Sequence, residues 1–130
     1  EAMRRARVRV AERYRTALAQ SELFKLPPED PTGSWHLFVL RLNLDRLSID
    51  RDRFIGELAE YGIGTSVHYV PLHLMRYYRD RYGLHPHDYP VSLRCYQEAI
   101  SLPIYPTLSD EEIDRVAGTV VDIGRRYTHG

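Results

Sequence analysis

Apolar side chains recur at helical spacing over several stretches of the chain. In residues 1–20 they form one stripe while arginines occupy the other faces, which predicts an amphipathic helix. The stripe consists of Met3, Val10, Tyr14, Ala17 and Leu18. Residues 48–61 predict a second helix, with Asp50 or Ser48 as the N-cap and Gly62 in the position that follows a helix end.

The C-terminal half shows three more helical patterns. Residues 72–83 predict a short helix or a pair of turns, and residues 90–100 predict a helix. Residues 107–127 carry the strongest signal, because Ser109 and Glu112 have the spacing of a capping box at the start of an apolar stripe. The members of that stripe are Ile113, Val116, Val120 and Ile123.

Three short segments have the composition of strands. Residues 35–44 are rich in aromatic and branched side chains, which predicts a strand buried on most of both faces. Residues 65–70 predict a second strand that stops at Pro71, since proline cannot donate to a β-ladder. Residues 101–106 predict a third, and the prolines and glycine of residues 25–34 predict a loop.

The elements therefore follow the order α β α β α α β α, without an internal repeat. This order predicts an α+β domain in which helices cover a small sheet of about three strands. At 130 residues, the chain fits one domain spanning residues 1–130.

The overall composition narrows the classes of partner. Basic and acidic residues balance at 18 each, so no net field favours nucleic acid or an anionic membrane. No apolar run approaches the roughly 20 residues of a membrane span. The single cysteine, Cys95, excludes an internal disulfide and is typical of a reducing compartment. We expect a cytoplasmic protein that binds neither nucleic acid nor membrane.

Lysine is nearly missing from the chain. Seventeen of the 18 basic residues are arginine, and the one lysine, Lys25, falls in the predicted loop. A lysine that forms a Schiff base needs desolvation or a nearby cation to lower its pKa, and a solvated loop provides neither. Covalent amine–carbonyl chemistry is therefore not expected within this chain.

The histidines raise the question of a metal site. His68 and His73 are five residues apart, which in a strand places them on opposite faces unless the turn at Pro71 redirects one. No carboxylates or cysteines group with them at zinc-site spacing, so no metal is expected. The residues alone indicate a polar site at the end of the second predicted strand.

Several motifs occur together in one order: SWHLFVLRL, YGIGTSVHYVPLH, YYRDRYG and ISLPIYPTLSDEEIDRV. Over residues 4–125 this pattern resembles the C-terminal small domain of the DegT/StrS-type nucleotide-sugar aminotransferases, which depend on pyridoxal 5′-phosphate (PLP). The resemblance implies the small domain of a fold-type I PLP enzyme, the aspartate-aminotransferase fold. It also implies that residues 1–20 are the tail of the interdomain helix and that the large PLP-binding domain is absent from this chain.

The resemblance implies an activity for the full-length enzyme. Such enzymes move an amino group from an amino acid, here expected to be glutamate, to a nucleotide-linked keto-sugar in polysaccharide biosynthesis. PLP would bind a lysine of the large domain, and the full-length enzyme would be a homodimer. The 130-residue chain alone is expected to hold no PLP and to be inactive.

The resemblance assigns site residues only in one segment. His68, Tyr69 and His73 match the part of the small domain that approaches the active-site cleft, where they would bind the substrate. No catalytic, cofactor-binding or metal-binding residue is carried over. The alternative is a free-standing binding or interaction module that resembles the aminotransferase small domain.

Overall fold

Strand β2 (Phe38–Leu42) determines the two faces of the sheet in the computed structural model, which describes residues 1–129. Phe38, Leu40 and Leu42 are buried, whereas the alternate side chains Val39 and Arg41 are only partly buried. This alternation is the pattern of a strand with one face on a core. The prediction of burial on both faces is therefore wrong.

The sheet is antiparallel and has the order β1-β2-β3, with β1 at Phe24–Lys25 and β3 at Ala99–Leu102. Leu40 pairs with Ile100 on the core face, and Val39 pairs with Ser101 on the opposite face. The expected α+β class with about three strands is confirmed.

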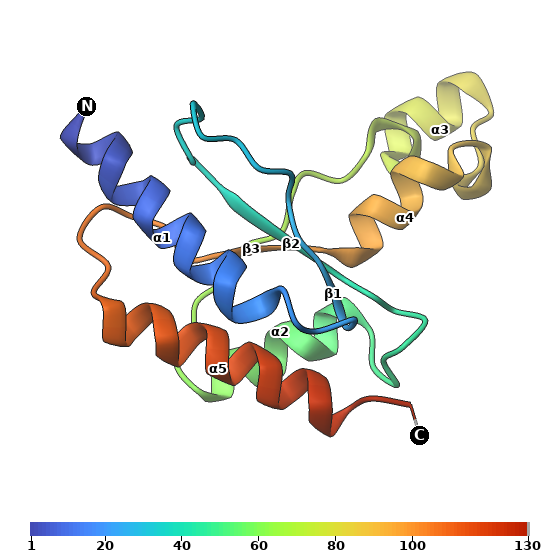
Figure 1. Ribbon diagram of the computed structural model, residues 1–130. Coiled ribbons are helices and arrows are strands. Elements are labelled where there is room, and N and C mark those ends of the chain that lie inside the picture. Colours follow the sequence, from blue (N-terminus) through green and yellow to red (C-terminus); the bar gives the residue numbers. More distant parts are fainter. Residues whose placement is uncertain (130) are drawn as a thin grey trace.

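Three helices pack on the sheet. Helices α1 (Ala2–Leu18) and α5 (Asp110–Arg126) lie side by side, and α2 (Arg51–Glu60) contacts both α5 and β3 (Figure 1). The predicted stripe of α5 is confirmed, because its four members are all buried. In α1 the buried residues are Val10, Ala11, Tyr14 and Leu18, whereas Met3 and Ala17 of the predicted stripe are exposed.

Ion pairs join α1 to α5. Arg13 donates to both carboxylate oxygens of Asp114, at 2.7 and 2.6 Å, and to Asp110 at 3.0 Å. Arg9 also pairs with Asp110. Part of the arginine-rich face of α1 is thus directed at another helix and not only at solvent.

Two helix starts and one helix end that the sequence predicts are confirmed. The Asp50 side chain accepts from the Arg53 backbone N–H at 2.8 Å, and Gly62 has a φ of +70° just after α2. Ser109 and Glu112 form both hydrogen bonds of the capping box.

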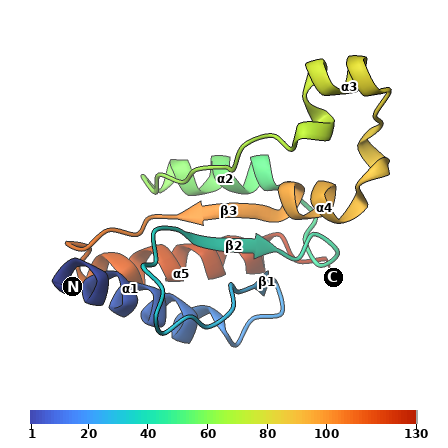
Figure 2. The same ribbon diagram turned by 90° about the horizontal axis from the view of Figure 1, so that it is seen from above.

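Residues 72–89 project away from the layered body (Figures 1 and 2). They contain two 3₁₀ turns, η1 (Leu72–Leu74) and η2 (Pro86–Asp88), on either side of helix α3 (Arg76–Tyr82). No residue of α3 is buried. The chain then returns through α4 (Pro90–Glu98).

Two further predictions about strands are wrong. Residues 65–70 form no strand, and their backbone pairs with the sheet at one isolated bridge, between Ser66 and Ser101. Their side chains find no core face there, as the 95% exposure of Tyr69 shows. Lys25 lies in β1 and not in a loop, because the edge of β2 gives this short segment a partner.

The third predicted strand is shifted toward the N-terminus. It runs over Ala99–Leu102 and stops before Pro103, which has no N–H to donate. Ala99 and Ile100 are consequently strand residues and not part of the preceding helix.

No helix among residues 1–129 combines the length and the apolar character needed to cross a membrane.

Candidate functional site

The bridge between Ser66 and Ser101 positions the GIGTSVHYV segment beside β3. The Ser101 N–H donates to the Ser66 carbonyl at 2.8 Å, and the Ser66 N–H donates to the Ser101 carbonyl at 3.2 Å. His68 lies two residues beyond Ser66 and therefore on the same side of this extended segment. Its Nε2 is 3.2 Å from the Ser101 hydroxyl oxygen. The bridge and this contact together hold His68 over the open face of the sheet.

A hollow of about 490 Å³ forms at this position. Its lining is mostly apolar and aromatic, with the polar groups of two serines and a histidine. The lining residues are Leu37, Ser66, Val67, His68, Tyr69, Val70, Tyr96 and Ser101. A concave, largely apolar surface with a few polar groups is typical of a small-molecule site.

The structure brings together two of the three predicted site residues. His68 and Tyr69 both line the hollow. His73 does not, since it is only 5% exposed and packs against the Tyr89 ring at 5.0 Å between centroids. His73 therefore joins the beginning and the end of the projecting segment 72–89, and its buried Nε2 has no hydrogen-bond partner in the described chain.

Ser101 is the residue of this site that the sequence analysis missed. It lies in the SLP motif, for which the sequence predicts only a strand. A usable signal was present, because Ser101 is a polar residue between two buried apolar ones, Ile100 and Leu102. In a strand, that alternation places its hydroxyl on the face opposite the core.

A second polar cluster lies on the same face as Ser101, where Lys25, Arg41 and Arg94 surround the fully buried carboxylate of Glu98. Burial raises the pKa of Glu98, but hydrogen bonds from Arg94, Lys25 and Arg41 outweigh it, so the net pKa is below the ordinary value. The cluster joins β1, β2 and α4.

This cluster bears on the question of PLP. Schiff-base formation requires a free lysine amine, but Lys25 Nζ donates to both oxygens of Glu98, at 3.0 and 3.2 Å. The chain has no other lysine. Its residues therefore do not fit covalent attachment of PLP.

Metal ligands are not assembled in the part of the chain that the structure describes. Residues 1–129 contain no group of three or more His, Cys, Asp or Glu side chains placed to hold an ion. His68 lies beside Ser101 and His73 packs against Tyr89, so the two histidines have separate surroundings.

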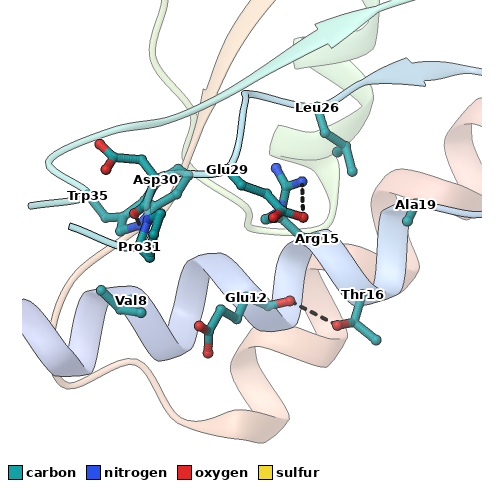
Figure 3. Close-up of a pocket in the computed structure, with 10 residues that line it drawn as sticks. All are labelled: Val8, Glu12, Arg15, Thr16, Ala19, Leu26, Glu29, Asp30, Pro31 and Trp35. Atoms are coloured by element: carbon teal, nitrogen blue, oxygen red, sulfur yellow. Dashed lines mark hydrogen bonds and ion pairs between the residues drawn. The ribbon is translucent and has the colours of Figure 1, made fainter. Parts of the chain in front are cut away.

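A larger hollow, of about 590 Å³, lies between α1 and the loop of residues 26–35 (Figure 3). Here Arg15 donates to the Pro27 carbonyl and, at 3.2 Å, to Glu29, while the Trp35 indole donates to the Asp30 carbonyl at 3.0 Å. These bonds attach the loop to the helix. None of the predicted site residues lines this hollow, so the hollow beside β3 is the better candidate.

The family model for DegT/DnrJ/EryC1/StrS aminotransferases matches residues 1–121. The chain belongs to this aminotransferase family. The resemblance inferred from the sequence motifs is thereby confirmed.

Two curated proteins are similar to this chain over most of its length. The uncharacterized protein MJ1066 of Methanocaldococcus jannaschii is 39% identical over 125 residues, which is 95% of this chain and 32% of that protein. The spore coat polysaccharide biosynthesis protein SpsC of Bacillus subtilis is 37% identical over 124 residues, which is 93% of this chain and 32% of SpsC. The chain thus spans about a third of the length of these two relatives.

A solved structure shows the same arrangement of elements. The putative sugar aminotransferase Spr1654 from Streptococcus pneumoniae, in its PMP form, superposes with a TM-score of 0.84 at 29% sequence identity. The superposition covers 95% of this chain and 31% of Spr1654. The small sheet and its helices are thus the architecture of one part of a family aminotransferase.

Proposed function

We propose that this chain is the small-domain part of a PLP-dependent aminotransferase that transfers an amino group from glutamate to a nucleotide-linked keto-sugar. The match of the family model to residues 1–121 carries this proposal. Two similar proteins support the substrate class, since SpsC is a polysaccharide biosynthesis protein and Spr1654 a putative sugar aminotransferase.

In this proposal the hollow beside β3 forms one wall of the substrate cleft. His68 offers a polar contact to the sugar, and the 95% exposed ring of Tyr69 offers a flat apolar surface for it. His73 acts less directly, by packing on Tyr89 and thereby fixing the chain that leaves the hollow. None of these residues performs the proton transfer.

The cofactor and its lysine belong to a large domain outside this chain. Bound PLP supplies the electron sink for amino transfer. The chain alone binds no PLP covalently and does not transaminate, and the complete enzyme is a homodimer that works in the cytoplasm.

The test is a spectroscopic half-reaction. The domain is produced together with a large PLP-binding domain as one enzyme, and this enzyme is mixed with glutamate and then with a UDP- or dTDP-linked keto-sugar. We expect the cofactor absorbance to change with glutamate and to recover with the keto-sugar. An enzyme whose absorbance responds to glutamate but to no nucleotide-linked sugar would refute the substrate class.

A free-standing interaction module is the second candidate. It is favoured by exposed apolar side chains on consecutive parts of one segment, namely Val67, Tyr69, Val70 and Leu72, with exposures between 41% and 95%. The coding sequence upstream distinguishes the two. A large domain in the same reading frame supports the enzyme, and an independent start codon supports the module.

A further inference from the structure

His68 has one side-chain hydrogen-bond partner within residues 1–129, and this partner determines which ring nitrogen carries the proton. We infer that the Ser101 hydroxyl donates to His68 Nε2 and thereby fixes the neutral imidazole with its proton on Nδ1. The nitrogen available to a ligand is then a hydrogen-bond donor, which selects an oxygen acceptor. Ser101 is in this sense a positioning residue.

Ser101 is held firmly enough to impose such a preference. Its N–H and carbonyl both bond to Ser66, and it pairs with Val39 across the β2–β3 ladder. The residue is only 5% exposed. The position of its hydroxyl oxygen is therefore fixed, and the contact with this oxygen can orient the His68 ring.

The direction of the hydrogen bond follows from burial. A hydroxyl carries one proton, and a buried donor left without an acceptor is unfavourable. Within residues 1–129 the Ser101 hydroxyl has one partner, His68 Nε2, at 3.2 Å. The hydroxyl satisfies its proton by donating to that nitrogen, so Nε2 must present its lone pair. A neutral imidazole carries its proton on one nitrogen only, and Nδ1 then holds it.

Nδ1 is the ring nitrogen of His68 that remains available to a ligand. Nδ1 makes no hydrogen bond to the described chain, and His68 lines the hollow beside β3. A neutral imidazole in this form donates to hydroxyl, carbonyl or phosphate oxygens and cannot accept a proton at Nδ1. The identity of that oxygen as one of the keto-sugar rests on the proposed function, whereas the tautomer does not.

The test is a long-range ¹H–¹⁵N correlation spectrum of the ¹⁵N-labelled chain at about pH 8, where an ordinary imidazole is neutral. We expect His68 to show the Nδ1–H pattern, with the other five histidines as references in the same spectrum. Ser101→Ala should move His68 toward the Nε2–H form that predominates in a free imidazole. Ser101→Thr, which keeps the hydroxyl, should restore the original pattern.

Ser92→Ala provides the matched control, because Ser92 is exposed on α4 and lies outside the hollow. It should leave the His68 pattern unchanged. A wild-type His68 in the Nε2–H form would overturn the inference, even if Ser101→Ala failed to fold. So would an unchanged tautomer in a folded Ser101→Ala protein. The spectrum is recorded without substrate, so its outcome is independent of the proposed function.

Discussion

The Lys25 ammonium donates to both carboxylate oxygens of Glu98, at 3.0 and 3.2 Å. Glu98 is fully buried, while the side chain of Lys25 remains 43% exposed. Arg41 donates to the same carboxylate at 3.0 and 2.7 Å, and Arg94 also pairs with it. One carboxylate therefore ties an edge strand, the central strand and a helix together, and three cations surround its single negative charge.

Replacing Glu98 by glutamine should destabilise the fold, because three cations would then converge on a neutral amide. Removing one partner of a buried ion pair costs roughly 3–5 kcal/mol, and the partial exposure of these cations reduces the expected loss to about 2–3 kcal/mol. Urea denaturation measures the free energy of unfolding. The same change at the exposed Glu60 should shift it by less than about 0.5 kcal/mol. Equal midpoints for the two variants would contradict this account.

The stability that Glu98 provides should depend on pH. Its pKa in the folded state lies below the ordinary value of 4.5, so the folded state favours the ionised carboxylate. The contribution is complete above about pH 4.5 and is lost as the pH falls through the lowered pKa. Urea titrations at pH 7, 5, 4 and 3 should show the gap between wild type and Glu98→Gln closing below pH 5. A gap that stayed constant down to pH 3 would contradict this linkage.

Lys25 should resist reductive labelling by PLP. The amine is held in its ion pair with Glu98, so incubation with PLP and borohydride should give no stoichiometric adduct at this residue. Peptide mass spectrometry separates Lys25 from the reactive N-terminal amine. In Glu98→Gln the labelling of Lys25 should increase, which provides the positive control. A stoichiometric Lys25 adduct in the wild-type chain that supported turnover would refute the proposal that this chain does not transaminate.

His68 should affect the sugar half-reaction more than the amino-acid half-reaction. In an enzyme that combines this domain with its large domain, His68→Ala removes one hydrogen bond to the sugar, which is worth about 1 kcal/mol. We expect kcat/KM for the nucleotide-linked sugar to fall about fivefold, with a smaller change for glutamate. His85→Ala, on the exposed projection, is the matched control. Unchanged kinetics for both substrates would reduce His68 to a packing residue.

Three helix boundaries could be predicted from the sequence because their determinants are local, whereas α4 ends two residues earlier than predicted because Ala99 and Ile100 pair with β2. The Asp50 cap, the left-handed Gly62 and the capping box of Ser109 and Glu112 each involve residues no more than three positions from the helix end. The buried stripe of α5 could also be predicted, since apolar residues that recur on one face of a helix identify its buried side. The ordered motifs identified the family without any knowledge of the fold.

Strand pairing could not be predicted in the same way. TSVHYV has the composition of a strand, but its backbone pairs with β3 at one bridge, at Ser66, whereas Phe24–Lys25, which was predicted as loop, pairs with β2. Composition gives a preference for extended backbone, but a strand needs a partner edge that lies far away along the chain. Burial of Val39 and Arg41 was overestimated for the same reason, because the sequence does not reveal which face the helices cover.

The sequence by itself determined the α+β class, the capped starts of α2 and α5, the family and the segment in which a polar site would lie, since all of these depend on neighbouring residues or on ordered motifs. Only the tertiary structure decided that His68 meets Ser101, that His73 turns away to Tyr89, and that Lys25 is bound to Glu98. These pairs are separated by 33, 16 and 73 positions along the chain. Contacts over such distances form only when the whole sheet and its helices have packed.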